Sequence, residues 1–251
     1  MKKRINKKIS RKLITRSSSD SARVKTGIPG FDDLISGGFK RYTVNLITGG
    51  PGSGKTIFAM QYLISGIEKY NENALYITFE EKRDKLYDDV KSFGWDIERY
   101  EKDKKFVFLE YTPEQVKRLL VEGGGIVENI VERYKIKRLV IDSISSFTLL
   151  YQDELAKKEA SLALFELIST WRCTAVVTSQ ESGESLESIS DAMGFEADSI
   201  ILMYYMKRKG GGRKRALEVL KMRGTQHSGK IWIMDIDAKK GVLVEKKVAD
   251  I

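Results

Sequence analysis

The sequence has few of the residues that cross-link small proteins or carry metal chemistry. It has one cysteine, one histidine and three prolines in 251 residues, so Cys173 has no disulfide partner and there is no Cys/His cluster for zinc. No run of about 18 apolar residues occurs, which excludes a membrane-spanning helix. Hydrophobic residues make up 41% of the chain and aromatic residues 10%, too many for a disordered protein.

Acidic residues are scarce in two segments, and these segments account for the positive charge of the chain. The formal net charge is +9. Residues 1–20 hold eight cations against Asp20, residues 207–215 hold six cations and no acid, and the remainder has a formal charge of −4. We therefore expect any nucleic acid or other polyanion to contact residues 1–16 or 207–215 of a mildly acidic body.

Residues 1–20 are predicted to form a disordered basic arm, because like charges at this density repel and core-forming residues are scarce. Ile5, Ile9 and Leu13 recur every four residues and would form a basic amphipathic helix on a suitable surface. Three interpretations stay open: a solvated extension, a contact with a polyanion, and a transit peptide. The arm has no apolar segment typical of a secretory signal, and we expect a cytoplasmic protein.

Residues 21–251 are predicted to form a single α/β domain. Strands and helices alternate up to residue 180, which predicts right-handed crossovers and a mostly parallel, twisted sheet flanked by helices. From residue 199 the apolar runs have little helical spacing between them, which predicts a C-terminal antiparallel extension. The expected strands are 42–48, 74–79, 106–110, 139–141, 174–178, 200–206, 216–222, 231–236 and 242–245, and the expected helices are 54–69, 82–93, 113–134 with an interruption at 123–125, and 153–171.

Residues 49–56 fit the P-loop pattern G-x-x-x-x-G-K-[ST] between a predicted strand and a predicted helix. Backbone N–H groups of such a turn converge on phosphate oxygens, and the helix N-terminus adds its positive dipole end. We expect Lys55 to reach the β- and γ-phosphates and Thr56 to ligate Mg²⁺; the alternative is a fortuitous Gly-rich turn. The predicted nucleotide-binding residues here are Gly50, Pro51, Gly52, Ser53, Gly54, Lys55 and Thr56.

Carboxylates follow two of the predicted strands. Asp142 ends a buried strand at the edge where open α/β sheets bind ligands, which suits a metal ligand for Mg²⁺; a helix N-cap is the alternative. Glu80 and Glu81 end strand 74–79, which a conventional sheet order places beside the P-loop strand. A carboxylate there would orient or deprotonate water for hydrolysis, and the spacing favours this role no more than a solvated helix start.

Two cations, Lys221 and Arg223, share one face of a predicted strand. They would either stabilise a transferring phosphoryl group, in the same chain or from a neighbouring subunit, or form a basic sheet edge that discourages aggregation. His227 is predicted to be a loop residue. The loop 206–215 is either a solvated hairpin or a polyanion-binding one, and no aromatic side chain within it would stack on nucleobases.

The pattern as a whole resembles the KaiC-like branch of the RecA/RadA superfamily, in its archaeal type with a single KaiC domain. The resemblance spans residues 22–236 and rests on the P-loop together with segments 26–34, 37–38, 78–81, 140–143, 178–180 and 221–227, in the family's order. It implies a RecA-like P-loop fold and an ATPase that hydrolyses ATP with Mg²⁺. A homohexameric ring is the family expectation, since head-to-tail interfaces close into rings.

The resemblance also implies roles for individual residues. Glu80 and Glu81 match the family's catalytic glutamates, with Glu80 as the water activator, and Gln180 matches its sensor position at the nucleotide. Lys221 and Arg223 match residues that reach the nucleotide of the neighbouring subunit, and His227 matches a position at the same interface.

The chain departs from the family pattern at three places. Lys40 and Tyr42 stand where a proline and a glycine usually precede the P-loop strand. Clock-type members carry two tandem copies, and this chain carries one. Gly194 and Phe195 stand roughly where the phosphorylating copy has a Ser-Thr pair, which argues against autokinase activity. We expect a regulatory or signalling ATPase; the alternatives are a DNA-binding ATPase of the RadA paralogue type and a nucleotide-gated scaffold with negligible turnover.

Overall fold

The computed structural model describes residues 23–180, 196–208 and 210–249. The basic arm expected at residues 1–20 and the pair Gly194-Phe195 lie outside these ranges. Within them, every helix is too short or too polar to cross a membrane.

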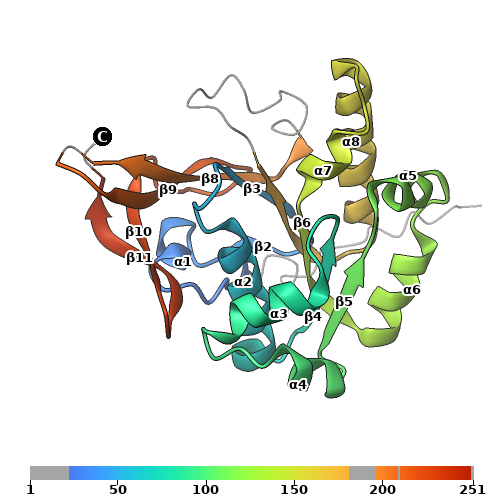
Figure 1. The fold of residues 1–251 in the computed structure, drawn as a ribbon, viewed down its shortest axis with the longest axis horizontal. Coiled ribbons are helices and arrows are strands. Elements are labelled where there is room, and N and C mark those ends of the chain that lie inside the picture. The colour runs from blue at the N-terminus through green and yellow to red at the C-terminus, as the bar shows by residue number, and fades with distance from the viewer. Residues whose placement is uncertain (1–22, 181–195, 209, 250–251) are drawn as a thin grey trace, which may run out of the picture.

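A mixed sheet forms the centre of the fold, and its strand order within the described ranges is β11-β10-β9-β8-β3-β7-β6-β4-β5 (Figure 1). The strands from β8 to β5 run parallel, and β9 to β11 are antiparallel. A separate two-stranded sheet pairs β1 with β2. The strands are β1 (Arg23–Val24), β2 (Phe39–Lys40), β3 (Val44–Gly49), β4 (Asn73–Thr78), β5 (Phe106–Glu110), β6 (Ile136–Asp142), β7 (Thr174–Ser179), β8 (Ser199–Lys207), β9 (Arg213–Met222), β10 (Trp232–Asp237) and β11 (Gly241–Val248).

Helices cover both faces of this sheet, as expected for the predicted α/β class. One apolar core packs the sheet against α2, α3 and α4, and the other packs it against α5 to α8. In Figure 1 the antiparallel strands β9 to β11 extend away from the helices α5 to α8, which lie at the opposite end of the sheet. The helices are α1 (Phe31–Leu34), α2 (Lys55–Tyr70), α3 (Arg83–Lys91), α4 (Ile97–Lys102), α5 (Pro113–Val121), α6 (Gly125–Tyr134), α7 (Ile144–Thr148) and α8 (Glu154–Thr170).

The predicted C-terminal extension is present, but its first expected strand was wrongly assigned to it. β8 pairs with β3 in parallel register, from Asn45 opposite Ser199 to Gly49 opposite Met203. The stretch between Ser179 and Ser199 exceeds the dozen or so residues that a parallel crossover needs. The antiparallel part therefore begins at β9.

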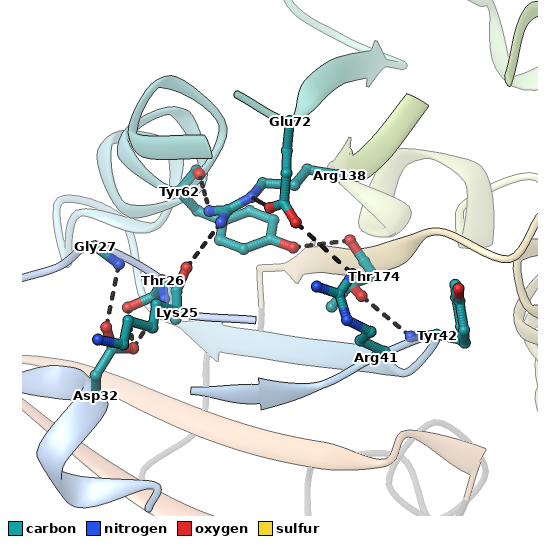
Figure 2. A network of polar contacts seen from close by, with 10 residues as sticks. All are labelled: Lys25, Thr26, Gly27, Asp32, Arg41, Tyr42, Tyr62, Glu72, Arg138 and Thr174. Carbon is teal, nitrogen blue, oxygen red and sulfur yellow. Dashed lines mark hydrogen bonds and ion pairs between the residues drawn. The ribbon is translucent and has the colours of Figure 1, made fainter. Parts of the chain in front are cut away.

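A buried cation, Arg138 of β6, ties the chain before the P-loop strand to the core (Figure 2). Its side chain is 1% exposed. Its guanidinium donates to Glu72 Oε2 at 2.7 Å, to the Tyr62 carbonyl at 2.8 Å and to the Lys25 carbonyl at 2.9 Å. Gly66 of α2 leaves room for it, because a Cβ there would lie 2.4 Å from Arg138 Cδ. The buried cation thus has one carboxylate and two backbone carbonyl oxygens as acceptors, which offset the cost of its burial.

Candidate nucleotide-binding site

The predicted P-loop connects β3 to α2 and has the backbone shape that its glycines allow. Gly52 has φ 76° and Gly54, the N-cap of α2, has φ 102°, values that L side chains rarely adopt. A Cβ at Gly54 would also lie 2.8 Å from Ile236 Cδ1 of β10. The turn is therefore fixed by backbone conformation and by close packing under β10.

Lys55 lies at the point where the loop and the predicted carboxylates meet. Its ammonium group donates to the carbonyl oxygens of Gly49 at 2.8 Å and Gly50 at 3.1 Å. Burial lowers the pKa of the Lys55 ammonium, and the nearby carboxylates of Asp142 and Glu80 oppose this shift. Residues from three parts of the sequence thus share one electrostatic environment.

Asp142, at the end of β6, is held by two hydroxyl donors. Tyr76 donates to Asp142 Oδ2 at 2.8 Å and Thr178 donates to Asp142 Oδ1. Burial, with a further contribution from Asp142, raises the pKa of the Tyr76 phenol well above its usual value, so this phenol stays a donor. Both oxygens of Asp142 are oriented by strands on either side of β6.

Glu80 is likewise held by hydroxyl groups from the next strand end. Ser143 donates to Glu80 Oε1 at 3.0 Å, and Ser146 of α7 donates to the same oxygen. The backbone N–H of Glu80 lies 3.3 Å from Thr78 Oγ1. The carboxylate is exposed but does not swing freely, because two serines fix one of its oxygens.

Glu81 does not join Glu80 in these contacts. It forms an ion pair with Lys85 one helical turn later, at 3.3 Å.

The expected position of β4 beside the P-loop strand is wrong. β4, which ends before these glutamates, is separated from β3 by β6 and β7. The spacing of residues along the chain does not determine the strand order, because the connection between two parallel strands can pass over other strands of the sheet. Glu80 nevertheless reaches the P-loop edge because all four strands end there.

Two polar atoms near the loop are buried without a described partner. Thr48 Oγ1 at the end of β3 and Ser53 Oγ inside the P-loop accept and donate no hydrogen bond among the described residues. Buried hydroxyls are usually paired, so their position beside the Gly-rich turn suits a ligand with oxygen acceptors. Thr56 is the second residue of α2, and Gln180 follows β7 with its backbone N–H donating to Ser145 Oγ at 2.6 Å.

Lys221 and Arg223 do not join this cluster in the same chain. Lys221 pairs with Ile200, which pairs with Leu46, so it lies about 10 Å back along the strands from Gly49. Burial and the charge of Arg223 lower the pKa of the Lys221 ammonium, and Asp198 and Glu196 oppose the shift. The charged groups around Lys221 therefore lie at the end of the sheet opposite to the P-loop.

One of the departures from the family pattern supports the segment that carries Arg223. Lys40 Nζ donates to the Arg223 carbonyl oxygen at 2.8 Å. His227 follows in the loop, as predicted, with Nδ1 3.2 Å from the Ser228 carbonyl oxygen. Ser36 Oγ donates to the carbonyl of Gln226 at 2.6 Å, so the loop is held along its length by the segment before β3.

Sequence reasoning missed a second contact with the P-loop, made by β9. Arg215 Nε donates to the Gly52 carbonyl oxygen at 2.9 Å, and its guanidinium lies over the Tyr205 ring, 4.6 Å from the centroid. Arg215 counted only as one of six cations in a loop. No local pattern in the sequence could have shown this contact, because it depends on the register that places Arg215 opposite Tyr205.

The fold and this edge of the sheet define a class of protein. A Gly-rich loop joins a parallel strand to a buried helix, and a lysine and two carboxylates meet at its strand ends, as in P-loop proteins of the RecA type. Sequence comparison then gives the family. The family described as "ATPase: KaiC" matches residues 24–249, and the chain belongs to it: it is a KaiC-like, ATP-binding member of the RecA superfamily.

Individual relatives agree with this assignment. The chain is 32% identical over 240 residues to the circadian clock protein KaiC3 of Synechocystis, matching 92% of this chain and 47% of that protein, so it spans about half that relative's length. It is 32% identical over 235 residues to the UPF0273 protein MJ1359 of Methanocaldococcus jannaschii, matching 88% of this chain and 96% of the relative. The crystal structure of the KaiC-like protein PH0186 from Pyrococcus horikoshii superposes with a TM-score of 0.79 at 36% identity, covering 90% of this chain and 99% of that one.

Proposed function

We propose that this chain hydrolyses ATP to ADP and phosphate in a ring of identical subunits and that it serves a regulatory or signalling role in the cytoplasm. The observation that carries this proposal is the convergence of Lys55, Asp142 and Glu80 at one edge of the sheet. Phosphoryl transfer to water needs a cation on the phosphates, a carboxylate for the metal and a group that positions the water. The three side chains match these needs.

The phosphates would lie against the backbone N–H groups of residues 50–56, where the α2 dipole adds its positive end. Lys55 would exchange its carbonyl partners for phosphate oxygens, which keep an ammonium charged better than carbonyls do. The orphan hydroxyl of Ser53 would gain an acceptor. Gln180, at the end of β7, would contact the γ-phosphate side of the site.

Thr56 and Asp142 are the residues that would hold Mg²⁺. Asp142 suits this role, because its two oxygens are oriented by the hydroxyls of Tyr76 and Thr178, and hard cations prefer oxygen ligands. When bound, the ion neutralises charge on the β- and γ-phosphates. Glu80 would orient the attacking water and accept its proton, with Glu81 as a supporting charge.

Lys221 and Arg223 would complete the site of a neighbouring subunit, and we propose a homohexamer. Their position at the opposite edge of the sheet argues against a role in their own site. A head-to-tail interface would bring this edge to the P-loop edge of the next copy, and such interfaces close into rings. Cations at that place would stabilise charge on the transferring phosphoryl group.

The test is the Glu80→Gln variant. We expect kcat for ATP hydrolysis to fall by about 100-fold or more, while the ATP dissociation constant changes by less than about threefold, because the amide cannot accept a proton. Glu110→Gln is the matched control: it makes the same change at the exposed end of β5, the strand beside β4. Full turnover in Glu80→Gln would refute the assignment.

A nucleotide-gated scaffold is the alternative within this site. It predicts that the unmodified protein binds ATP but releases no ADP above the level of Glu80→Gln. A DNA-binding ATPase is the other alternative, and the described observation that favours a polyanion partner is the basic hairpin between β8 and β9.

A further inference from the structure

The hairpin between β8 and β9 surrounds a recess with positive charge. The recess has a volume of about 370 Å³, within the range of small-ligand sites, and is lined by Tyr205, Lys207, Arg208, Gly211, Gly212 and Arg213. Lys207, Arg208 and Arg213 are exposed. None of the three forms an ion pair with any acid in the described part of the chain, so their charge is available to a ligand.

One cation of the recess is already held in place. Arg213 donates to the Tyr205 carbonyl oxygen at 2.9 Å, and its guanidinium lies 5.2 Å from the centroid of the Tyr205 ring. A guanidinium fixed in this way loses less entropy when it binds an anion than a free side chain does.

The tip of the hairpin is open to an approaching chain. Gly210, Gly211 and Gly212 have φ values of 104°, 96° and 76°, and a Cβ at any of them would meet nothing within 4 Å. A ligand backbone can therefore come close to the peptide groups of the tip. Several cations in so small a volume match a ligand that carries charge on every repeating unit, as a chain of phosphate groups does and an isolated carboxylate does not.

The base of the hairpin rests on the P-loop. Arg215 holds the Gly52 carbonyl at 2.9 Å, and a Cβ at Gly52 would lie 3.2 Å from Tyr205 Cδ1. Tyr205 thus contacts the recess on one side and the P-loop on the other. A shift of Tyr205 or of the adjacent strand on ligand binding changes the support of Gly52, whose neighbours bind phosphate in the proposed function.

We propose that this recess binds a chain of phosphate groups and that the contact of Arg215 with Gly52 couples its occupancy to the affinity of the P-loop for ATP. The binding part stands on the hairpin alone, whereas the coupling part rests on the proposed nucleotide site. Two sources supply such a chain, single-stranded nucleic acid and inorganic polyphosphate, and both carry the phosphate chemistry that the recess recognises.

Binding is tested without nucleotide, on the full chain, by fluorescence anisotropy with labelled oligothymidylate and by competition with polyphosphate and with polyglutamate. We expect salt-sensitive binding and a loss of about tenfold or more in the Lys207→Ala/Arg208→Ala variant. The slope of log affinity against log salt should fall in magnitude by about 1.4, since each phosphate contact with a single strand contributes about 0.7. Lys239→Ala/Lys240→Ala, which removes two exposed cations from the turn between β10 and β11, is the matched control and keeps full affinity.

The competitors identify the source of the ligand and can overturn the proposal. Displacement by polyphosphate shows that the phosphate chain suffices, and failure of polyphosphate with retained oligonucleotide binding assigns the site to nucleic acid. Equal competition by polyglutamate, or unchanged affinity in Lys207→Ala/Arg208→Ala, refutes a phosphate-chain site in the recess.

Coupling is tested by measuring ATP affinity with and without saturating oligonucleotide. We expect a change of about fivefold, and by linkage ATP must change oligonucleotide affinity by the same factor. Arg215→Ala should reduce both factors to less than about twofold while the oligonucleotide still binds. Coupling that persists in Arg215→Ala overturns the proposed route, whereas a failure of ATP binding in the unmodified protein refutes the proposed function and leaves the anion site standing.

Discussion

Ser143 donates a hydrogen bond to Glu80 Oε1 at 3.0 Å and so joins the end of β6 to the end of β4. Ser146 donates to the same oxygen from the first turn of α7. The proposed water-activating carboxylate is thus oriented by a neighbouring strand end, and Oε2 accepts no hydrogen bond from the described residues. This leaves one oxygen to face a water molecule.

Removing the two hydroxyls should slow the chemical step without weakening ATP binding. For Ser143→Ala/Ser146→Ala we expect kcat to fall about 10-fold, equivalent to about 1.4 kcal/mol of lost transition-state stabilisation, because Glu80 loses its fixed orientation. KM should stay within about twofold, since neither serine belongs to the P-loop. Steady-state kinetics of ATP hydrolysis measure both constants.

Two further variants separate positioning from a loss of fold. Ser143→Thr/Ser146→Thr keeps the hydroxyls and should recover most of the lost kcat. Ser92→Ala removes an exposed hydroxyl that donates to the Asp89 carbonyl at 3.0 Å, and should leave kcat unchanged. A rise in KM with constant kcat would contradict a positioning role.

Mixing two inactive variants should restore activity if the site is shared between subunits. Arg223→Ala should lower kcat by about 100-fold or more, since it removes a cation from the transferring phosphoryl group. Mixed with Glu80→Gln protein, roughly one site in four would pair an intact Glu80 with an intact Arg223. Recovered ATP hydrolysis after subunit exchange measures this, and a mixture as inactive as its components would contradict the shared site.

Because Arg138 is buried, we expect its substitution to cause a large loss of stability. Arg138→Ala removes the buried donor of two backbone carbonyls and leaves Glu72 with Arg41 alone, at 3.7 Å, and we expect the free energy of unfolding to fall by about 3–5 kcal/mol. Arg99→Ala is the control, because Arg99 is exposed and lies 3.9 Å from Asp103, where an ion pair contributes less than about 1 kcal/mol. Denaturant unfolding followed by circular dichroism compares the two, and equal losses would contradict the prediction.

The buried thiol of Cys173 should react slowly with alkylating agents even at alkaline pH. Burial raises the pKa of its thiol to about 12, so the folded protein should resist alkylation at about pH 8.5, the ordinary thiol pKa, and react fully in guanidinium. Mass spectrometry after iodoacetamide treatment checks this. Rapid labelling of the native protein would show that the thiol is accessible.

The same group should destabilise the fold at high pH. Above about pH 9 the unfolded thiol loses its proton and the folded one does not, so stability falls as pH rises toward 12, by up to about 1.4 kcal/mol per pH unit. Tyrosines ionise in the same range, so the difference between the unmodified protein and Cys173→Ala isolates the thiol. The variant should lose stability less steeply, and parallel curves would contradict the assignment.

Local patterns in the sequence were enough for the elements and for the nucleotide loop. All nine strands expected from apolar runs are present in the main sheet with bounds shifted by a few residues. The predicted helix interruption is also present, at residues 122–124 between α5 and α6, one residue earlier than expected. The sequence analysis missed the short elements α1, α4, α7, β1 and β2. Helices of one or two turns and strands of two residues are too short to show a hydrophobic period.

The sequence by itself determined the α/β class, the P-loop and the split between a mildly acidic body and its basic segments, since each depends on residues close together in the chain. Only the tertiary structure decided that β6 and β7 separate β4 from β3, that serines hold Glu80, and that Arg215 supports the P-loop. These relationships depend on strand order and register, which arise from packing between distant segments and leave no periodic mark on the chain.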